Sequence, residues 1–371
     1  MIAVGPDDQV YPVTKIAIIV DALVAAGVSA ADALVGVNIP GSALSSPATR
    51  VSLSQVIKCC RNATRLARDP RFAYRTGLRF HVTAYGLYGF AMLCSTDFRR
   101  TMRFSERYRQ LATPITEISF EEEGDRAVWT IFPISHPLVN ASVYRFLVEL
   151  HFGIRVSLHR DVMGPSFVVR ELDVTYDPPD DALTYPSTFG CPVFFNRPAN
   201  KFIFDSAWLD RSPELGNEIT YAAIVKLCDE QMEELQLRIG LVGKVREILL
   251  LNLMRPMSLD AVADRLRVTT RTLQRKLHEE NTSFRKLVDE LRMYMTIKYL
   301  RQTDLTAEDM AHVLGFSDAA NFRHALRRWT KSAPLTFKEL RAAFATPDAE
   351  SQRPRAINTP KARHRTPSMR S

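Results

Sequence analysis

The spacing of apolar residues predicts helices in the first part of the chain. Between residues 13 and 28 the apolar positions lie three or four residues apart, as on one helix face: Ile16, Ile19, Val20, Leu23 and Val24. Gly27 is expected to end this helix. We also expect a helix over residues 52–67, capped by Ser52 or Ser54, and an amphipathic helix over residues 95–111.

Alternating apolar and polar residues predict strands further along. The runs 115–120 and 127–132 are joined by Glu-Gly-Asp, which indicates a hairpin. The other elements expected here are one helix and two strands, over residues 141–158, 167–176 and 201–209. The mixture of helices and strands predicts an α+β domain whose boundary lies near Ser212.

Helical periodicity then dominates from Glu218 to Phe344. Residues 346–371 contain four prolines and six basic residues but few large apolar ones, so they cannot bury a core and are expected to form a disordered basic tail. The predicted organisation is an α+β effector-sensing or dimerisation domain, a linker helix region, an all-α domain and the tail, over residues 1–212, 213–240, 241–345 and 346–371.

Two parts of the helical region repeat each other, forty-eight residues apart. The matching pairs are Ala263 with Ala311, Leu266 with Leu314, Thr269 with Ser317 and, after one extra residue in the second copy, Leu273 with Phe322 and Leu277 with Leu326. Each copy has the pattern of a short helix, a tight turn and a second helix, which predicts a helix-turn-helix unit. Ser258 and Thr306 are the expected caps, and Gly315 lies in the second turn.

The second helix of each copy is rich in side chains that suit DNA. Arginine can donate two hydrogen bonds to guanine and glutamine can pair with adenine, whereas lysine and threonine hold phosphates. In the first copy we expect DNA contacts from Thr269, Thr270, Arg271, Thr272, Gln274, Arg275 and Lys276. In the second copy we expect them from Ser317, Ala320, Asn321, Arg323, His324, Arg327 and Arg328.

The segment between the copies, residues 282–303, predicts a connecting helix. A helix of about 20 residues spans roughly 30 Å, close to the ~34 Å repeat of duplex DNA. One chain is therefore expected to place both second helices in successive major grooves, each about 12 Å wide.

The formal net charge of +8 is concentrated towards the C-terminus. Residues 1–240 hold 24 lysines and arginines against 27 acidic residues, residues 241–345 hold 19 against 12, and residues 346–371 hold 6 against 2. Such a distribution attracts phosphate groups, of nucleic acid or of an anionic membrane surface. The repeated units favour double-stranded DNA.

The runs RTLQRKLHEENTSFRKLVDELRMYMTIKYL and AHVLGFSDAANFRHALRRWTKSAPLTFKELR resemble the double helix-turn-helix domain of AraC/XylS-family transcription regulators. The resemblance covers about residues 241–342. The runs HVTAYGLYGFAML and FGCPVFFNRPANKFIFDSAWLD resemble the arabinose-binding-type regulatory domain of the subgroup that includes the ornithine-utilisation regulator OruR. The family match implies base-facing roles for Arg271, Gln274, Arg275 and His324.

Two residues depart from the family pattern. Arg267 stands where a turn glycine is usual, which costs about 1 kcal/mol if the position is left-handed. His324 stands where an arginine is usual, so the second unit is expected to read fewer bases or to rely more on phosphate contacts.

Other features point less clearly to chemistry. Adjacent Cys59 and Cys60 suggest a methyl-accepting DNA-repair enzyme with the same DNA-binding domain, but the zinc-binding cysteine cluster of such enzymes is missing from the sequence. The tripeptide HRD at residues 159–161 lacks the other motifs of a kinase, and Gly86 and Gly89 are too few for a dinucleotide fingerprint. We expect structural roles for the histidines at 81, 136, 151 and 159, no metal and no cofactor.

The sequence therefore predicts a regulatory α+β domain followed by an all-α double helix-turn-helix DNA-binding domain, not an enzyme. The expected partners are promoter DNA, RNA polymerase, a small-molecule effector in the N-terminal domain and a second copy of the chain. The composition predicts a cytoplasmic protein without a membrane span, since no apolar run reaches about 18 residues. A DNA-modifying enzyme and a non-specific architectural binder are the competing interpretations.

Overall fold

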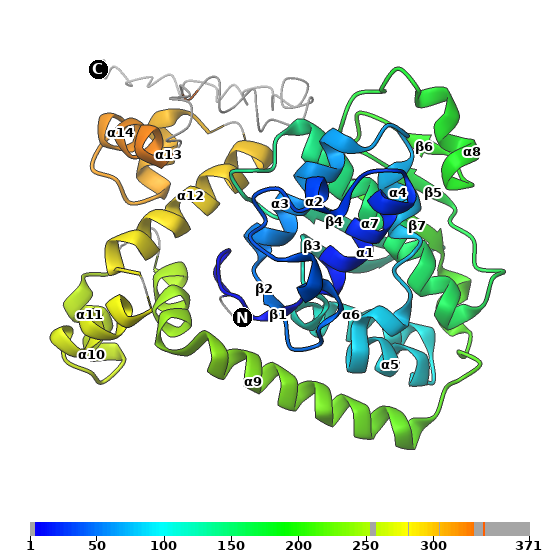
Figure 1. Cartoon of the computed structure of the whole chain (residues 1–371), viewed down its shortest axis with the longest axis horizontal. Helices are drawn as coiled ribbons and strands as arrows, with labels where there is room; N and C mark the ends of the chain where they lie inside the picture. The colour runs from blue at the N-terminus through cyan, green and yellow to red at the C-terminus, as the bar shows by residue number, and fades with distance from the viewer. Residues whose placement is uncertain (1–3, 253–256, 281, 304, 330–336, 338–371) are drawn as a thin grey trace, which may run out of the picture.

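The computed structural model describes residues 4–252, 257–280, 282–303, 305–329 and 337. Figure 1 shows an α+β part and a series of small helical units, joined by one long helix. The predicted basic tail, residues 346–371, lies outside the described residues. Within the described parts of the chain, the helices are too short or too polar to cross a membrane.

Local sequence signals predict where α1 (Thr14–Ala25) and α3 (Leu53–Leu66) begin and end, whereas the helix predicted over residues 95–111 is shorter and the one predicted over residues 141–158 extends to Met163. α1 stops just before Gly27, which has a φ of 84° that would strain a residue with a side chain. Ser52 caps α3 by accepting a hydrogen bond from the Gln55 N–H at 3.2 Å. The remaining helices are α2 (Ala30–Ala33), α4 (Phe72–Gly77), α5 (Gly86–Cys94), α6 (Phe98–Arg107), α7 (Ala141–Met163) and α8 (Tyr185–Phe189). Short 3-10 turns lie at Gly41–Ser45, Val82–Tyr85, Arg109–Ala112, Ala182–Thr184 and Ser206–Asp210.

A five-stranded sheet has the order β3-β4-β7-β5-β6. Its strands are β3 (Thr116–Glu123), β4 (Arg126–Pro133), β5 (Glu171–Asp173), β6 (Val193–Phe194) and β7 (Asn200–Asp205). Neighbouring strands are antiparallel except β5 and β6. β3 and β4 form the predicted hairpin, with Gly124 at a φ of 65° in its turn. A separate antiparallel pair joins β1 (Tyr11–Pro12) to β2 (Arg50–Val51).

Two predicted strands are shorter than their apolar patterns indicate. In the run 167–176 only β5 pairs as a strand, and Phe167 instead enters an aromatic cluster with Phe204 at a centroid distance of 5.4 Å. The run 201–209 ends as a strand at Asp205, because its side chain accepts from the Ala207 N–H at 2.8 Å and starts a 3-10 turn. Burial alone, without strand pairing, explains these apolar residues.

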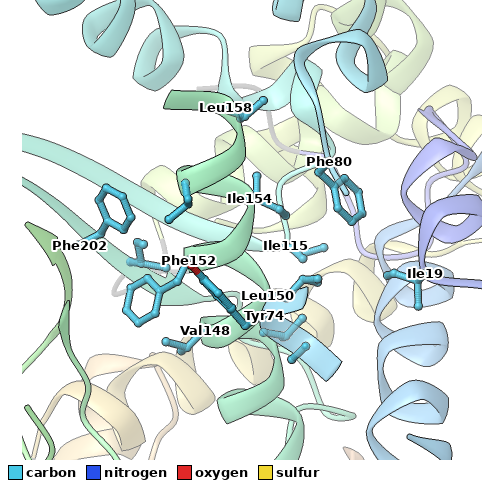
Figure 2. Packing of buried hydrophobic residues seen from close by; sticks show 14 of the residues in the cluster. Ile19, Tyr74, Phe80, Ile115, Val148, Leu150, Phe152, Ile154, Leu158 and Phe202 are labelled. Carbon is cyan, nitrogen blue, oxygen red and sulfur yellow. The ribbon is translucent and has the colours of Figure 1, made fainter. Parts of the chain in front are cut away.

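α7 lies at the centre of the hydrophobic core. Eighteen of its 23 residues are buried, so the helix is covered on nearly all sides. Figure 2 shows Phe152 on the side of α7 towards Phe202 of the sheet, and Phe80 and Ile19 on the opposite side. Polar groups on α7 are therefore held away from water, among them Arg155 at 3% exposure.

Glycines allow α4 and α7 to cross at close range. A Cβ on Gly153 would lie 2.2 Å from the Tyr74 carbonyl oxygen, and one on Gly77 would lie 2.2 Å from the Leu150 carbonyl oxygen. Both obstacles are backbone atoms, which cannot rotate aside. Gly89 likewise lies against the Val82 carbonyl oxygen, so close packing explains why this residue is glycine.

The helical part begins with α9 (Glu218–Leu251), which has non-helical dihedral angles at Gly240. It continues with α10 (Leu259–Arg265), α11 (Thr270–Glu279), α12 (Phe284–Gln302), α13 (Ala307–Val313) and α14 (Ala319–Trp329). In Figure 1, α12 runs from the unit of α10 and α11 to the unit of α13 and α14. The predicted boundary at residues 240–241 thus falls inside α9, at its kink.

Each helical unit has its own hydrophobic cluster. The first cluster includes Val245, Val262, Leu273, Leu277 and Leu287. The second includes Leu300, Met310, Leu314, Phe322 and Leu326, with Phe316 and Trp329 packed against it. The leucines and the phenylalanine that the repeat aligns therefore belong to these two clusters or pack against them.

Replacing Gly153 with alanine is expected to lower the free energy of unfolding by about 3 kcal/mol, because the new methyl group overlaps backbone atoms of α4. Urea denaturation would measure the loss. Gly41→Ala is the control, since a Cβ at residue 41 meets nothing within 4 Å, and it should change stability by less than about 0.5 kcal/mol. Equal effects of the two substitutions would contradict this account of the crossing.

Candidate functional site

The first helical unit is built by local capping signals. Ser258 caps α10 by accepting from the Ala261 N–H at 3.2 Å, as predicted. Thr269 caps α11 by accepting from the Thr272 N–H at 3.2 Å. Leu273 and Leu277, four residues apart, turn one face of α11 into the core, which leaves the opposite face to solvent. α10 and α11 therefore form a helix-turn-helix with a solvent-exposed second helix.

The same helix-ending turn occurs in both units. In the first, the Arg267 N–H donates to the Asp264 carbonyl at 3.0 Å and the Val268 N–H to the Ala263 carbonyl at 3.0 Å, with Arg267 at a φ of 55°. This is a Schellman motif, in which the first residue after the C-cap of the helix, here Arg267, adopts the left-handed conformation. Arg267 thus occupies a left-handed position, and the steric cost inferred from the sequence applies.

Gly315 takes the equivalent position in the second unit, at a φ of 69°. Its N–H donates to the His312 carbonyl at 3.1 Å, and the Phe316 N–H donates to the Ala311 carbonyl at 2.8 Å. The two turns therefore match bond for bond at the spacing of the sequence repeat. A shared turn sets a shared exit direction for α11 and α14 from their units.

The predicted DNA-contacting residues of the first unit lie on or beside the outer face of α11. Exposed side chains are Thr269, Arg271, Gln274, Arg275 and Lys276. Thr270 and Thr272 are half-buried, and the Thr270 hydroxyl donates to Asp260 of α10 at 2.6 Å. The guanidinium of Arg275 pairs with Glu279 one turn later, in an exposed contact that DNA can replace at small cost.

The second unit exposes Ser317, Ala320, Asn321, Arg323, His324, Arg327 and Arg328, which includes every predicted residue. The Asn321 side-chain amide donates to the Ser317 hydroxyl at 2.7 Å and to Asp318 at 3.0 Å, so it is already engaged. Arg323 pairs with Glu308 at 3.4 Å. Arg328 donates to both carboxylate oxygens of Asp289 at 2.8 Å and so ties α14 to α12.

Two residues that sequence reasoning missed shape this unit. Asp318 accepts from the Asn321 N–H at 2.8 Å, and this hydrogen bond holds the pKa of its carboxyl below the usual value. Arg292 of α12 donates to the carbonyls of Leu314 and Gly315 at 3.0 and 2.8 Å, and its guanidinium lies 4.2 Å from the Phe316 ring. The sequence could have indicated Asp318, because aspartate is a preferred N-cap residue. No residue near Arg292 in the sequence indicates that this side chain binds a turn 22 residues away.

A cavity of about 410 Å³ lies in the α+β part. Its walls come from five separated stretches of chain, within residues 10–15, 47–50, 80–87, 110–113 and 231–235. The last stretch belongs to α9, and it ends five residues before Gly240. The volume falls in the usual range for small-molecule sites, roughly 300–1,000 Å³.

The cysteines and histidines have structural surroundings. Cys59 and Cys60 are fully buried, and burial raises the pKa of the Cys60 thiol to about 12, so neither offers an accessible thiolate. His81 pairs with Asp161 at 3.0 Å, and Asp161 also accepts from the Val82 N–H, which gives part of the HRD tripeptide a packing role. His136, His151 and His159 also have hydrogen-bond partners: the Ser54 hydroxyl, the Thr116 hydroxyl and the Arg155 carbonyl.

Replacing Arg267 with glycine is expected to raise the free energy of unfolding by about 1 kcal/mol, because glycine removes the steric cost at a φ of 55°. Chemical denaturation of the full chain would measure the gain. The matched control is Arg265→Gly in the last turn of α10, which should instead lose about 1 kcal/mol because glycine is a poor helix former. Destabilisation by both changes would contradict the strain at residue 267.

Known families and proteins match this arrangement. The arabinose-binding N-terminal domain of AraC transcription regulators matches residues 27–213, about half of the chain, and a helix-turn-helix domain family matches residues 262–339. The ornithine utilization regulator of Pseudomonas aeruginosa is 27% identical over 89% of this chain and 97% of its own length. The HTH-type transcriptional regulator VqsM of the same organism is 25% identical over 71% of this chain and 82% of its own.

Among solved structures, the transcriptional regulator CdpR of Pseudomonas aeruginosa is 20% identical with a TM-score of 0.46, over 88% of this chain and 97% of its own. The family matches cover most of the α+β part and most of the two helix-turn-helix units, in the order that the structure shows. The chain therefore belongs to the AraC family of DNA-binding transcription regulators, with an arabinose-binding-type domain ahead of its helix-turn-helix domain.

Proposed function

We propose that α11 and α14 bind successive major grooves of promoter DNA and that a small molecule in the N-terminal cavity controls this binding. The observation that carries the proposal is the pair of matching Schellman turns, which present two exposed basic helices from units joined by α12. The 19 residues of α12 span about 28 Å, near the ~34 Å repeat of the duplex.

In the first unit, Arg271, Gln274 and Arg275 are the proposed base readers. All three are exposed on α11, while Leu273 and Leu277 hold the opposite face in the core. Arginine and glutamine each form two-point contacts with a base edge. Lys276 presents a single charge from the same helix and suits a phosphate.

In the second unit, phosphate contacts are proposed to dominate. His324 offers one ring nitrogen as donor when neutral, where an arginine would offer a planar fork. Asn321 is engaged by Ser317 and Asp318. Arg328 is held by both oxygens of Asp289, so Arg327 and Arg323, whose ion pair with Glu308 is exposed, are the more available cations. Such a unit adds affinity and register more than sequence discrimination.

Effector control is proposed to act through α9. Gln231, Glu234 and Leu235 of α9 line the cavity, and Val242 and Val245, beyond the Gly240 kink, belong to the core of the first helix-turn-helix unit. A ligand that binds more tightly at one angle between the two halves of α9 favours the corresponding orientation of α11. The size of this shift is limited by the difference between the ligand's affinities for the two states.

Contacts between the α+β part and the helical part are the interactions that a ligand can strengthen or weaken. Glu117 of β3 accepts a hydrogen bond from the Tyr294 hydroxyl and pairs with Lys298 of α12 at 3.3 Å.

We further propose a homodimer, RNA polymerase as a partner at the promoter, a cytoplasmic location, and domain limits at residues 1–212, 213–240 and 241–345.

Recovery of genomic DNA fragments by the purified full-length protein tests the proposed function. A few sites that share a two-part motif, its halves about 10 base pairs apart, are expected from two reading helices on one face of the duplex. Uniform recovery of all fragments would instead favour a non-specific architectural binder.

Arg275→Ala is expected to weaken binding to a recovered site by about 1–3 kcal/mol and to relax sequence preference at one position, because it removes a two-point base contact. Lys276→Ala should weaken binding to all sequences alike. It should also lower the salt slope, the change of log K with log salt concentration, by about 1, as expected for one phosphate contact. Fluorescence anisotropy at fixed salt, on the site and on single-base variants, measures the affinities, and a series of salt concentrations on the site measures the salt slope.

Arg79→Ala, an exposed arginine of the α+β part, is the control and should leave DNA affinity unchanged. If Arg275→Ala and Lys276→Ala lowered the affinity for every sequence equally, Arg275 would not be a base reader.

A further inference from the structure

We propose that the N-terminal cavity binds an organic carboxylate whose negative charge is received by Lys15 and Arg155. This inference rests on the proposed effector role of the cavity and names the chemical class of its ligand. Its basis is a pair of buried cationic side chains that share one space and face no carboxylate at ion-pair distance among the described residues.

Lys15 enters the cavity from α1. Only 6% of the residue is exposed, although lysine is seldom buried without a partner. Its Nζ lies 5.5 Å from the centre of the Phe80 ring and 5.7 Å from the centre of the Tyr85 ring. These rings offer weak cation–π contacts and cannot neutralise the charge.

Arg155 comes from α7 and is held in a fixed orientation. Its guanidinium lies 3.9 Å from the centre of the Trp129 ring, and its Nε donates to His151 Nε2 at 3.2 Å. Because His151 Nε2 accepts, its Nδ1 carries the hydrogen and donates to the Thr116 hydroxyl at 2.9 Å. The Nη1 of Arg155 is buried and has no hydrogen-bond partner in the described structure.

The two cations line one recess, which adjoins the larger cavity. A recess of about 30 Å³, with room for a group of a few atoms, is lined by Lys15, Arg155 and His151. Lys15, Tyr85 and Thr113 line both this recess and the larger cavity. A carboxylate in the recess reaches both cations, while the rest of the ligand extends into the cavity.

The electrostatics of the free protein favour an anionic ligand. Burial, with a further contribution from Arg155, lowers the pKa of Lys15 to about 8, and burial also lowers the pKa of Arg155. Glu106, which acts on Arg155 from a distance, accepts a hydrogen bond from the Phe120 N–H at 3.3 Å. Unpaired buried cations destabilise the fold, so a ligand that supplies the missing charge gains binding energy from both.

The remainder of the cavity indicates an apolar body for the ligand. Phe80, Leu87, Leu111 and Leu235 contribute apolar walls. The guanidinium of Arg50, also at the wall, donates to the carbonyls of Pro47 and Thr49 and is thereby engaged. A ligand held at Lys15 that fills this space reaches Leu235 of α9, which links carboxylate binding to the helix that enters the DNA-binding part.

Calorimetric titration of the full-length protein tests the inference with paired acids and amides: butyrate, octanoate and benzoate against butyramide, octanamide and benzamide. At least one acid is expected to bind at least tenfold more tightly than its amide. Lys15→Met keeps the length of the side chain and removes its charge; it should abolish that preference and raise the melting temperature of the free protein. Lys58→Met, outside the cavity lining, is the control and should change neither.

Three results would overturn the carboxylate site: equal binding of every acid and its amide, no binding of any acid, or an acid preference that survives in Lys15→Met. Inorganic phosphate is titrated in parallel, and tight phosphate binding without acid binding counts against the proposal too. The outcome is separate from the DNA test. A protein that recovers specific promoter fragments but does not prefer acids refutes only this inference, whereas acid binding with uniform DNA recovery refutes only the proposed function.

The pH dependence of acid binding gives an independent readout. The titratable and charged groups beside Lys15 or lining the same spaces are Cys60 of α3, Glu234 of α9, His151 and Arg155 of α7, Arg50, Arg109, and the tyrosines at 11, 85 and 88. Burial raises the pKa of Cys60 to about 12 and keeps that of His151 well below 6.5, so neither changes charge near pH 8. Octanoate affinity is therefore expected to be constant from about pH 6.5 to 7.5 and to fall about tenfold per unit well above pH 8, as Lys15 loses its proton. Lys15→Met should show no such fall, and a fall that persisted in that variant would assign the effect to another group.

Discussion

The structure depends on one helix that belongs to two hydrophobic cores. Before its kink, α9 places Tyr221 and Cys228 in the core of the α+β part, and after it Val245 enters the core of the first helix-turn-helix unit. The two halves of α9 meet at Gly240, with a φ of 58° and a ψ of −147°. That region is essentially restricted to glycine, so the angle between the halves relies on the absence of a side chain at one residue.

Close to the kink of α9, a buried cation is paired with carboxylates of the same chain. Arg246, 6% exposed, pairs with Asp8 at 2.5 Å and with Glu290 at 3.5 Å. Two carboxylates thus meet one buried guanidinium, as the cost of burying a charge requires. Lys15 and Arg155 are buried to a similar degree without such partners. The contrast within one chain argues that their missing anion is supplied from outside the fold.

Local signals explain which parts of the fold the sequence predicts well. Ser52, Ser258 and Thr306 cap helices because their side chains satisfy N–H groups of the next turn, and the repeat places residues 267 and 315 in equivalent left-handed turns. The outer faces of α11 and α14 follow from helical periodicity alone. Contacts between distant segments have no such local signal. For this reason the sequence did not predict the hydrogen bond from Arg292 to the Gly315 carbonyl.

The cavity escaped prediction for the same reason, since its walls come from stretches of chain more than 200 residues apart. In the sequence, Lys15 looks like an ordinary polar residue in the first turn of an amphipathic helix. Only its packing against the Phe80–Tyr85 segment, and its place in the recess beside Arg155, show that its charge is buried. A fold selected for stability alone would place an apolar side chain there. In the proposed carboxylate site, two unpaired cations make the empty protein less stable, and an anionic ligand gains binding energy by neutralising them. In the proposed effector control, such a ligand shifts the DNA-binding domain only by the difference between its affinities for two states of the protein.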